Sequence, residues 1–355
     1  SGKTTVFNAL TRGHAPTSIS SAASKPNIGV AKVADPRLDR LAEIFLPQRT
    51  VAAEVTYVDI PGAPEGLGRR QGIGGAFLND LQRADAMLHV VRAFDDASVP
   101  HVSGSVDPFR DVSAMDMELT FSDMAIMERR LRRLEAELKG AKPAQRDAAQ
   151  RERHLLERVQ ARLEEGAPVR AQAFTPDETA LLAGYQFLTA KPLLVVLNID
   201  EGQLPQASAV EDELTSRLEG PGVLGAALCG KLEAELGQMD GEDEQEFRDS
   251  LGAGEPGRER LARLAFEALG LVTFFTVVSN EVRAWAIAKG APAVKAAGKV
   301  HSDMERGFVR AEVIGFDDLA ECSGMAEAKK RGLLRLEGKA YGVQDGDVIL
   351  FLFSV

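Results

Sequence analysis

The first residues of the chain constrain its fold most, because they read as a phosphate-binding turn that runs into a helix. Ser1-Gly2-Lys3-Thr4 matches the second half of the signature G-x-x-x-x-G-K-[ST], and a helical pattern continues to Leu10. In this interpretation Gly2 lets the backbone approach a phosphate, Lys3 reaches the β- and γ-phosphates, and the Thr4 hydroxyl holds Mg²⁺. An ordinary helix start would explain these residues equally well without further support. We expect the natural chain to extend upstream, where the first glycine of the signature would lie.

A second motif ends the apolar run 55–60. Asp59 is followed at the third position by Gly62, which is the D-x-x-G spacing that P-loop GTPases use to hold Mg²⁺ and sense the terminal phosphate. The glycine-rich stretch behind it suits either a switch loop or a plain surface loop. A helix over 76–83 and a strand over 86–92 are expected next.

Two later strands end where GTPases recognise the base. The run 191–198 has a buried-strand pattern and ends in Asn198-Ile199-Asp200-Glu201, where a GTPase carries N-K-x-D. The run 225–228 leads into Cys229-Gly230-Lys231, where a GTPase usually carries S-A-K. These motifs, in this order and at strand ends, predict a parallel α/β sheet whose ligand binds beyond the carboxyl ends of the strands.

Composition excludes several classes of function. Lys and Arg number 42 against 53 Asp and Glu, and the net charge of −11 argues against a general polyanion binder, so no recognition of DNA sequence is expected. Two cysteines cannot form a disulfide framework and suit a reducing cytosol. No apolar run approaches the ~20 residues of a membrane span, and no signal peptide is visible. We therefore expect a cytoplasmic protein with no membrane contact.

The middle of the chain predicts two helices joined by a short loop at 140–143. The first carries apolar residues at steps of three and four, as in a coiled coil: Met124, Met127, Leu131, Leu134 and Leu138. The second places Leu156, Val159 and Leu163 on one face. Residues 119–170 hold 12 Lys and Arg against 9 Asp and Glu, with the most basic spot at 129–133. This surface is either a contact for RNA or an acidic partner, or a solvated helix face.

The C-terminal part, from about residue 271, predicts a binding module without a catalytic constellation. Strands are expected over 272–278, 309–314 and 348–353, and a helix near 281–288 that contains Trp285. The acidic stretch 233–249 is interpreted as a solvated surface helix and loop, and His89, in an apolar run, as a core histidine.

With these motifs in place, the chain resembles the YchF family, the Obg-like ATPases among the translation-factor-related P-loop NTPases. The resemblance covers essentially the whole chain and rests on matching stretches at 2–11, 25–30, 35–39, 59–62, 89–94, 101–104, 281–285, 297–303, 305–313 and 343–349. It implies a nucleotide domain over 1–112 and 185–270, a coiled-coil insertion over 113–184, and a TGS domain of ubiquitin-like β-grasp fold over 271–355.

The resemblance also implies a site and an activity: slow hydrolysis of ATP in preference to GTP, because N-x-x-E replaces N-K-x-D, by a switch associated with the ribosome or ribosomal RNA. Mg²⁺ would be held by Thr4 and Asp59. The residues implied for nucleotide binding are Gly2, Lys3, Thr4, Thr5, Gly62, Asn198, Ile199, Glu201, Leu228, Cys229 and Gly230.

Three positions bear on hydrolysis. The usual water-orienting Gln is replaced by Ala63, and the family's proposed substitute, a His in the following loop, matches His101. A neutral imidazole can orient water or accept its proton. The family's metal-contacting Thr aligns with Ala23, which has no oxygen to offer, and Ser21 or Ser24 is the alternative ligand nearby. The alternative is therefore a nucleotide- and RNA- or ribosome-binding protein with little or no turnover.

Overall fold

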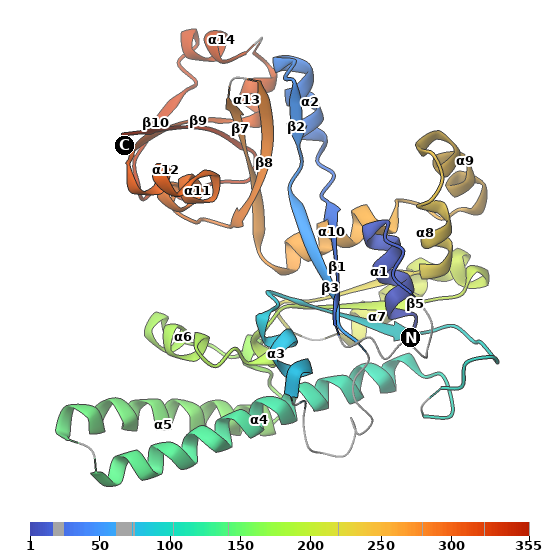
Figure 1. The fold of residues 1–355 in the computed structure, drawn as a ribbon, viewed down its shortest axis with the longest axis vertical. Coiled ribbons are helices and arrows are strands. Elements are labelled where there is room, and N and C mark those ends of the chain that lie inside the picture. Colours follow the sequence, from blue (N-terminus) through green and yellow to red (C-terminus); the bar gives the residue numbers. More distant parts are fainter. Residues whose placement is uncertain are drawn as a thin grey trace. The chain divides into compact units, whose positions relative to one another are not determined.

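The computed structural model describes residues 1–16, 25–61, 73, 75–101, 103–140, 142–218, 220–278, 280–322 and 324–354. These residues form two compact units, shown in Figure 1. The first unit comprises residues 1–29 and 58–257, and the second comprises residues 30–57 and 258–355. Residues 30–57 thus group with the C-terminal residues, although they fall within the nucleotide domain in the division made from sequence. The three boundaries of that division stay a prediction.

The first unit is built on a parallel sheet in the order β4-β5-β6. Its strands are β4 (Met87–Arg92), β5 (Leu193–Asn198) and β6 (Val223–Leu228). Every residue of β5 is buried, as expected for a central strand covered on both faces. Arg92 pairs with Asn198, and Asn198 pairs with Leu228, so the three strands end level at one carboxyl edge. The predicted parallel α/β arrangement is confirmed.

Helices flank this sheet, and α1 packs against α8. The helices and 3₁₀ turns of the first unit besides its hairpin are α1 (Lys3–Thr11), α3 (Gly75–Arg83), η1 (Val169–Ala171), α6 (Pro176–Ala183), η2 (Leu188–Ala190), η3 (Glu201–Gln206), α7 (Ala207–Arg217), α8 (Gly230–Leu236) and α9 (Gly241–Leu251).

The interpretation of 233–249 as a solvated acidic surface is wrong for Glu233, Glu244 and Arg248, which are buried. Glu233 and Glu244 are buried around the guanidinium of Arg248, which is fully buried. Arg248 Nη2 lies 2.7 Å from Glu233 and 3.0 Å from Glu244. Acidic residues become core residues here because a buried arginine supplies a counter-charge that composition alone does not reveal.

Two paired strands, β1 (Asn27–Lys32) and β3 (Glu54–Asp59), each have one end in the first unit and the other end in the second. Asn27 and Asp59 are the ends that belong to the first unit. The chain between the two strands, residues 33–53, belongs wholly to the second unit.

The predicted pair of helices forms a helical hairpin of α4 (Pro108–Gly140) and α5 (Pro143–Glu164), which lie side by side (Figure 1). Met127 and Leu134 of the predicted seam are fully buried against the apolar face of α5. Pro143 opens α5 because a proline at the first position of a helix loses no hydrogen bond. None of the described helices combines the length and apolar character needed to cross a bilayer.

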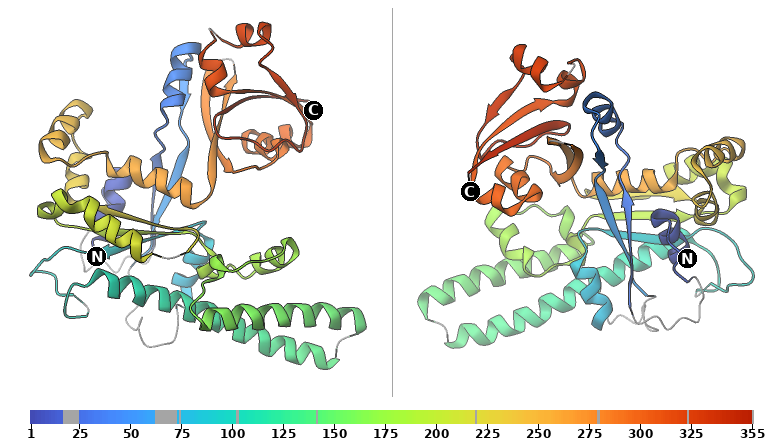
Figure 2. Two further views of the ribbon diagram at one scale, coloured as in Figure 1. Left: turned by 180° about the vertical axis from the view of Figure 1, so that it is seen from behind. Right: turned by 45° about the horizontal axis from the view of Figure 1, so that its top comes forward.

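The second unit is a sheet in the order β10-β9-β11-β7-β8-β2. Its strands are β2 (Arg49–Val51), β7 (Leu271–Val278), β8 (Glu281–Ala288), β9 (Phe308–Gly315), β10 (Arg335–Glu337) and β11 (Asp347–Phe353). Its helices are α2 (Pro36–Phe45), α10 (Gly257–Ala268), α11 (Ala293–Val300), α12 (Ser302–Arg306), α13 (Phe316–Ala320) and α14 (Met325–Lys330). Strand β11 is parallel to β7 and antiparallel to β9, and α11 and α12 pack on the sheet (Figure 2). This arrangement agrees with the expected β-grasp.

The helix expected near 281–288 is wrong, because these residues form strand β8. The alanines of the segment favour a helix, but β8 pairs antiparallel with β7 at every position from Glu281 to Ala288. Val282 and Ala284 point into the core in strand alternation. Tertiary pairing therefore overrides local propensity here.

Candidate nucleotide-binding site

The start of α1 and the end of β3 meet in a polar cluster around Asp59, which is buried. Lys3 Nζ donates to Asp59 Oδ1 at 2.5 Å and also to the carbonyl oxygen of Ile60. Thr4 Oγ1 donates to Asp59 Oδ2 at 3.0 Å, and Asn27 Nδ2 donates to the same oxygen at 3.1 Å. The Gly-Lys-Thr segment of the first motif and the Asp of the D-x-x-G motif therefore lie together.

Asn198, the last residue of β5, binds the turn that opens α1. Its Nδ2 donates to the carbonyl oxygen of Ser1 at 3.1 Å, and its Oδ1 accepts the backbone N–H of Gly230 at 2.9 Å. Gly2 has a φ of 74°, and a Cβ there would lie 2.3 Å from Asn198 Nδ2. Both the left-handed backbone and the close approach of the amide require glycine at this position. Asn198 thus ties the phosphate loop to the turn after β6.

The turn after β6 brings three further predicted residues beside Asn198. Leu228 ends β6, Cys229 precedes α8 as its cap, and Gly230 begins α8. A Cβ on Gly230 would lie 2.8 Å from Val6 Cγ2, so glycine lets α8 pack closely on α1. Burial raises the pKa of the Cys229 thiol, which therefore stays protonated and unreactive at neutral pH.

The last three residues of the Asn-Ile-Asp-Glu segment make different contacts. Glu201 Oε1 lies 3.1 Å from Lys231 Nζ in an exposed ion pair, which links this segment to the turn after β6. Asp200 Oδ1 accepts the N–H of Gly202 at 2.9 Å and so caps η3. Ile199 is 2 % exposed and packs in the core of the first unit. Its side chain offers almost no surface to a base, so the base contact assigned to it stays a prediction that this geometry does not support.

His101 lies beyond β4 in a loop held by Arg92. The buried Arg92 guanidinium donates to three carbonyl oxygens of the loop, those of Phe94 at 3.0 Å, Asp96 at 3.1 Å and Val99 at 2.7 Å. These bonds satisfy a buried charge and fix the loop that precedes His101.

Thr5 and Gly62 are the remaining residues implied for nucleotide binding. Thr5 lies in the first turn of α1 and is half-buried. Gly62, Ala23 and Ala63 lie outside the described residues.

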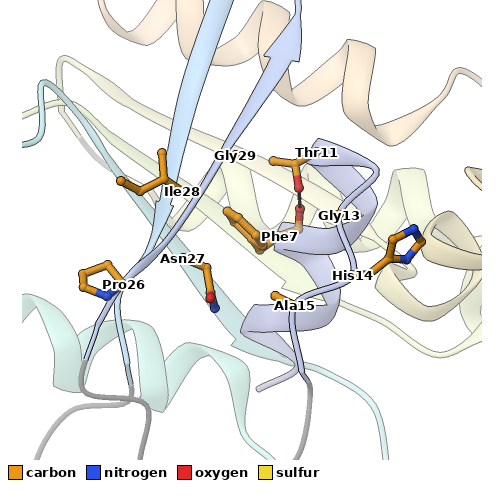
Figure 3. Close-up of a pocket in the computed structure, with 9 residues that line it drawn as sticks. All are labelled: Phe7, Thr11, Gly13, His14, Ala15, Pro26, Asn27, Ile28 and Gly29. Carbon is orange, nitrogen blue, oxygen red and sulfur yellow. Dashed lines mark hydrogen bonds between the residues drawn. The ribbon is translucent and has the colours of Figure 1, made fainter.

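A cavity of about 430 Å³ lies beside the cluster around Asp59, between α1 and the start of β1. In Figure 3, Phe7 and Thr11 project from α1 while Asn27 and Ile28 come from β1. Asn27 is shared between this cavity and the hydrogen bond to Asp59. His14 lies at the far rim of the cavity (Figure 3).

Comparison with known proteins decides the family. A family model described as "50S ribosome-binding GTPase" matches residues 1–123, and the model of the YchF GTPase C-terminal region, described as "Protein of unknown function (DUF933)", matches residues 271–354. The "Ribosome-binding ATPase YchF" of Bacillus subtilis is 39% identical over 357 residues, which cover 100% of this chain and 96% of that protein. The chain belongs to the YchF family. The protein of the same name from Escherichia coli O157:H7 is 38% identical over 356 residues, with the same coverage.

Solved structures agree with this membership. The structure of the Schizosaccharomyces pombe YchF GTPase matches with a TM-score of 0.84 and 30% identity, covering 99% of this chain and 94% of that one. The match spans both units of this YchF-family chain, so it supports the nucleotide-binding architecture together with the C-terminal sheet.

The oxygen donors around Asp59 fit a hard divalent cation. Thr4 Oγ1 and Asp59 Oδ2 lie 3.0 Å apart and are the donor types that such cations prefer, with phosphate and water oxygens completing the shell. Lys3 shares the Asp59 carboxylate and is long and flexible enough to turn toward a phosphate instead. The residues present therefore fit a cation–phosphate group.

Sequence reasoning missed three residues that hold this YchF-family site: Asn27, Arg92 and Asp111. Arg92 carries a recognisable signal, because it is a charge at the carboxyl end of an apolar strand. Asn27 was visible only as part of a matching stretch at the start of β1. Asp111 contacts His101 across ten positions of sequence through a fold-dependent pairing, and no local pattern points to it.

Proposed function

We propose that this protein is a nucleotide-dependent switch that binds ATP with Mg²⁺, hydrolyses it slowly, and acts in the cytoplasm in association with the ribosome. The observation that carries the proposal is the convergence of Lys3 and Thr4 on Asp59, with Asn198 bound to the loop in front of them. The curated relatives bear the name of a ribosome-binding ATPase.

In this proposal the phosphates lie at the N-terminus of α1, where the backbone N–H groups and the helix dipole favour negative charge. Lys3 exchanges Asp59 for a phosphate oxygen. Thr4 and Asp59 hold Mg²⁺, which supplies charge neutralisation at the phosphates when bound. Gly62 belongs to the same proposed site through the D-x-x-G spacing.

The preference for ATP over GTP rests on Glu201. A GTPase places an Asp at this position to accept two N–H groups of guanine, and the longer Glu201 side chain is paired with Lys231 instead. Nothing in the Asn-Ile-Asp-Glu segment then favours guanine. Asn198 binds the phosphate loop and the turn after β6. In this proposal Leu228, Cys229 and Gly230, which lie beside Asn198, are the neighbours of the base.

For the ribosome, we propose the helical hairpin as the contacting surface and the C-terminal β-grasp, a TGS domain by family resemblance, as a second binding module. The hairpin carries 12 Lys and Arg against 9 Asp and Glu over 119–170 within an acidic chain, so its charge complements RNA.

The test is equilibrium binding and single-turnover hydrolysis of ATP and GTP by the full-length protein, with and without Mg²⁺. Lys3→Ala should lower hydrolysis to background, whereas Lys142→Ala, an exposed lysine just before α5, should leave it unchanged. Tighter binding of GTP than of ATP would refute the base preference. Wild-type turnover no higher than that of Lys3→Ala would instead support the alternative, a nucleotide- and ribosome-binding protein without turnover.

A further inference from the structure

Both ring nitrogens of His101 are engaged. Its Nε2 lies 2.9 Å from Asp111 Oδ2, and its Nδ1 accepts the backbone N–H of Ser103 at 3.1 Å. The two side chains are sheltered, with 14% of His101 and 21% of Asp111 exposed. His101, the candidate for orienting the attacking water, is therefore bound to protein groups through both ring nitrogens.

The pattern of hydrogen bonds fixes the tautomer. Nδ1 accepts an N–H and so carries no proton, which places the proton of the neutral ring on Nε2, where it is donated to Asp111. Nδ1 faces its own turn, which the N–H of Gly104 closes on the carbonyl oxygen of His101 at 3.0 Å. Nε2, bound to Asp111, is a donor in this arrangement and cannot accept a hydrogen bond from water.

Asp111 is itself fixed. It lies in the first turn of α4, where a carboxylate is favoured by the helix dipole. Its Oδ1 accepts from Arg110 Nε at 3.0 Å and Nη2 at 2.8 Å, and Arg110 also donates to the carbonyl oxygen of Ser105 at 2.8 Å. One carboxylate oxygen is bound to Arg110, which leaves the other for His101.

We propose that Asp111 is a latch, a positioning residue that keeps His101 from acting on the attacking water until the pair separates. The inference rests on the proposed function, and it takes as the catalytic group His101, which the family resemblance implies as the residue that orients or deprotonates the attacking water. On separation the ring also leaves the N–H of Ser103, so that Nδ1 takes up a proton from solvent while Nε2 releases its own, with no net change in the number of protons on the ring. Nε2 then carries the lone pair that accepts a hydrogen bond from water.

The latch predicts that removing the carboxylate speeds hydrolysis. Asp111→Ala should raise the single-turnover rate about fivefold, the equivalent of one ordinary hydrogen bond. Asp111→Asn should give a smaller increase, because its amide oxygen still accepts from Nε2. Glu135→Ala, which removes an exposed carboxylate from the same helix, should leave the rate unchanged. The double variant His101→Ala/Asp111→Ala should be no faster than His101→Ala.

A second readout follows the ring directly. In ¹⁵N-histidine NMR spectra, His101 should be in the Nε2–H form in the wild type and a mixture of both tautomers in Asp111→Ala. A slower Asp111→Ala with unchanged ATP affinity would overturn the latch, since Asp111 would then orient His101 for catalysis. A rate increase that persists without His101 would overturn it too. Wild-type turnover at the level of Lys3→Ala would reject the proposed function instead, so the two failures are distinguishable.

Discussion

At the residue scale, several buried polar side chains bind backbone groups and so hold loops in place. Asn198 binds the carbonyl of Ser1, and Arg92 binds three carbonyls of the loop before His101. Asp123 is fully buried and accepts the N–H groups of Leu188 and Thr189 at 2.8 Å each, which ties α4 to the segment that enters β5. A buried donor or acceptor without a partner is costly, so each pairing specifies one loop conformation.

His89 gives a prediction at this scale. Burial lowers its pKa to about 4, against 6.5 in the unfolded chain. Between these values the unfolded chain binds more protons, so the free energy of unfolding falls as pH falls through this window. The loss between pH 7 and pH 5 should be about 2 kcal/mol.

Urea unfolding at pH 5 and pH 7 measures this loss, and His89→Gln is the comparison because its side chain does not titrate. We expect the variant to lose about 2 kcal/mol less than the wild type on acidification. Burial raises the pKa of Asp123 to about 6, and its contribution runs in the opposite direction, but it is present in both proteins and cancels. Equal losses in the two proteins would show that His89 is not buried as a neutral ring.

At the scale of elements, the sequence predicted what periodicity and motif order control. The parallel strands and the helical hairpin follow from apolar runs and from steps of three and four residues, which burial enforces. It could not predict β8, where pairing with β7 overrides the helical preference of alanine, nor the His101–Asp111 pair, which depends on how the loop folds back on α4. The residues of the site were visible as motifs, whereas the residues that hold them in place were not.

The hairpin supplies the prediction for elements. Its four clustered arginines are not equivalent, because Arg130 is bound to Glu152 at 2.6 Å and Arg132 lies 3.4 Å from Glu128. Arg129 and Arg133 are exposed and make no ion pair with any residue that the structure describes. Reversing both charges should therefore weaken binding to ribosomes without disturbing the hairpin.

Cosedimentation with ribosomes over a range of salt concentrations measures this effect. In Arg129→Glu/Arg133→Glu the slope of log affinity against log salt should fall by about 2, one for each lost phosphate contact. Arg83→Glu/Arg217→Glu, which makes the same charge change at exposed positions of α3 and α7, outside both proposed ribosome-binding surfaces, serves as the control. A hairpin variant that binds as the wild type does would show that this surface is only a solvated helix face.

For the whole molecule, the chain between β1 and β3 is the least expected feature. It lies between two nucleotide-site motifs in sequence, yet β2 pairs parallel with β8 and joins the C-terminal sheet. Arg37, at the start of α2, donates to Asp345 at 2.6 Å and to Asp35 at 2.8 Å. No sequence motif predicts the pairing of β2 with β8 or of Arg37 with Asp345, because neither partner lies in a distinctive local pattern.

We expect Arg37 to affect the nucleotide site, although it lies outside the site motifs in the sequence. The C-terminal residues support the segment that joins β1 to β3, and those strands present Asn27 and Asp59 to Lys3 and Thr4. Arg37→Ala should remove charge-assisted hydrogen bonds, lower the free energy of unfolding of the second unit by about 2 kcal/mol, and speed amide exchange across 33–53.

Arg40→Ala is the matched control, because Arg40 lies on the same helix and its ion pair is an exposed one with Glu43. Hydrogen–deuterium exchange with mass spectrometry separates the two segments of interest, 33–53 and β4 to β6. Faster exchange in 33–53, with β4 to β6 unchanged and ATP affinity reduced, would establish that the C-terminal sheet supports the nucleotide site through β1 and β3. If Arg37→Ala and Arg40→Ala exchange alike, the segment does not depend on this ion pair, and the pairing of β2 with β8 alone must hold it.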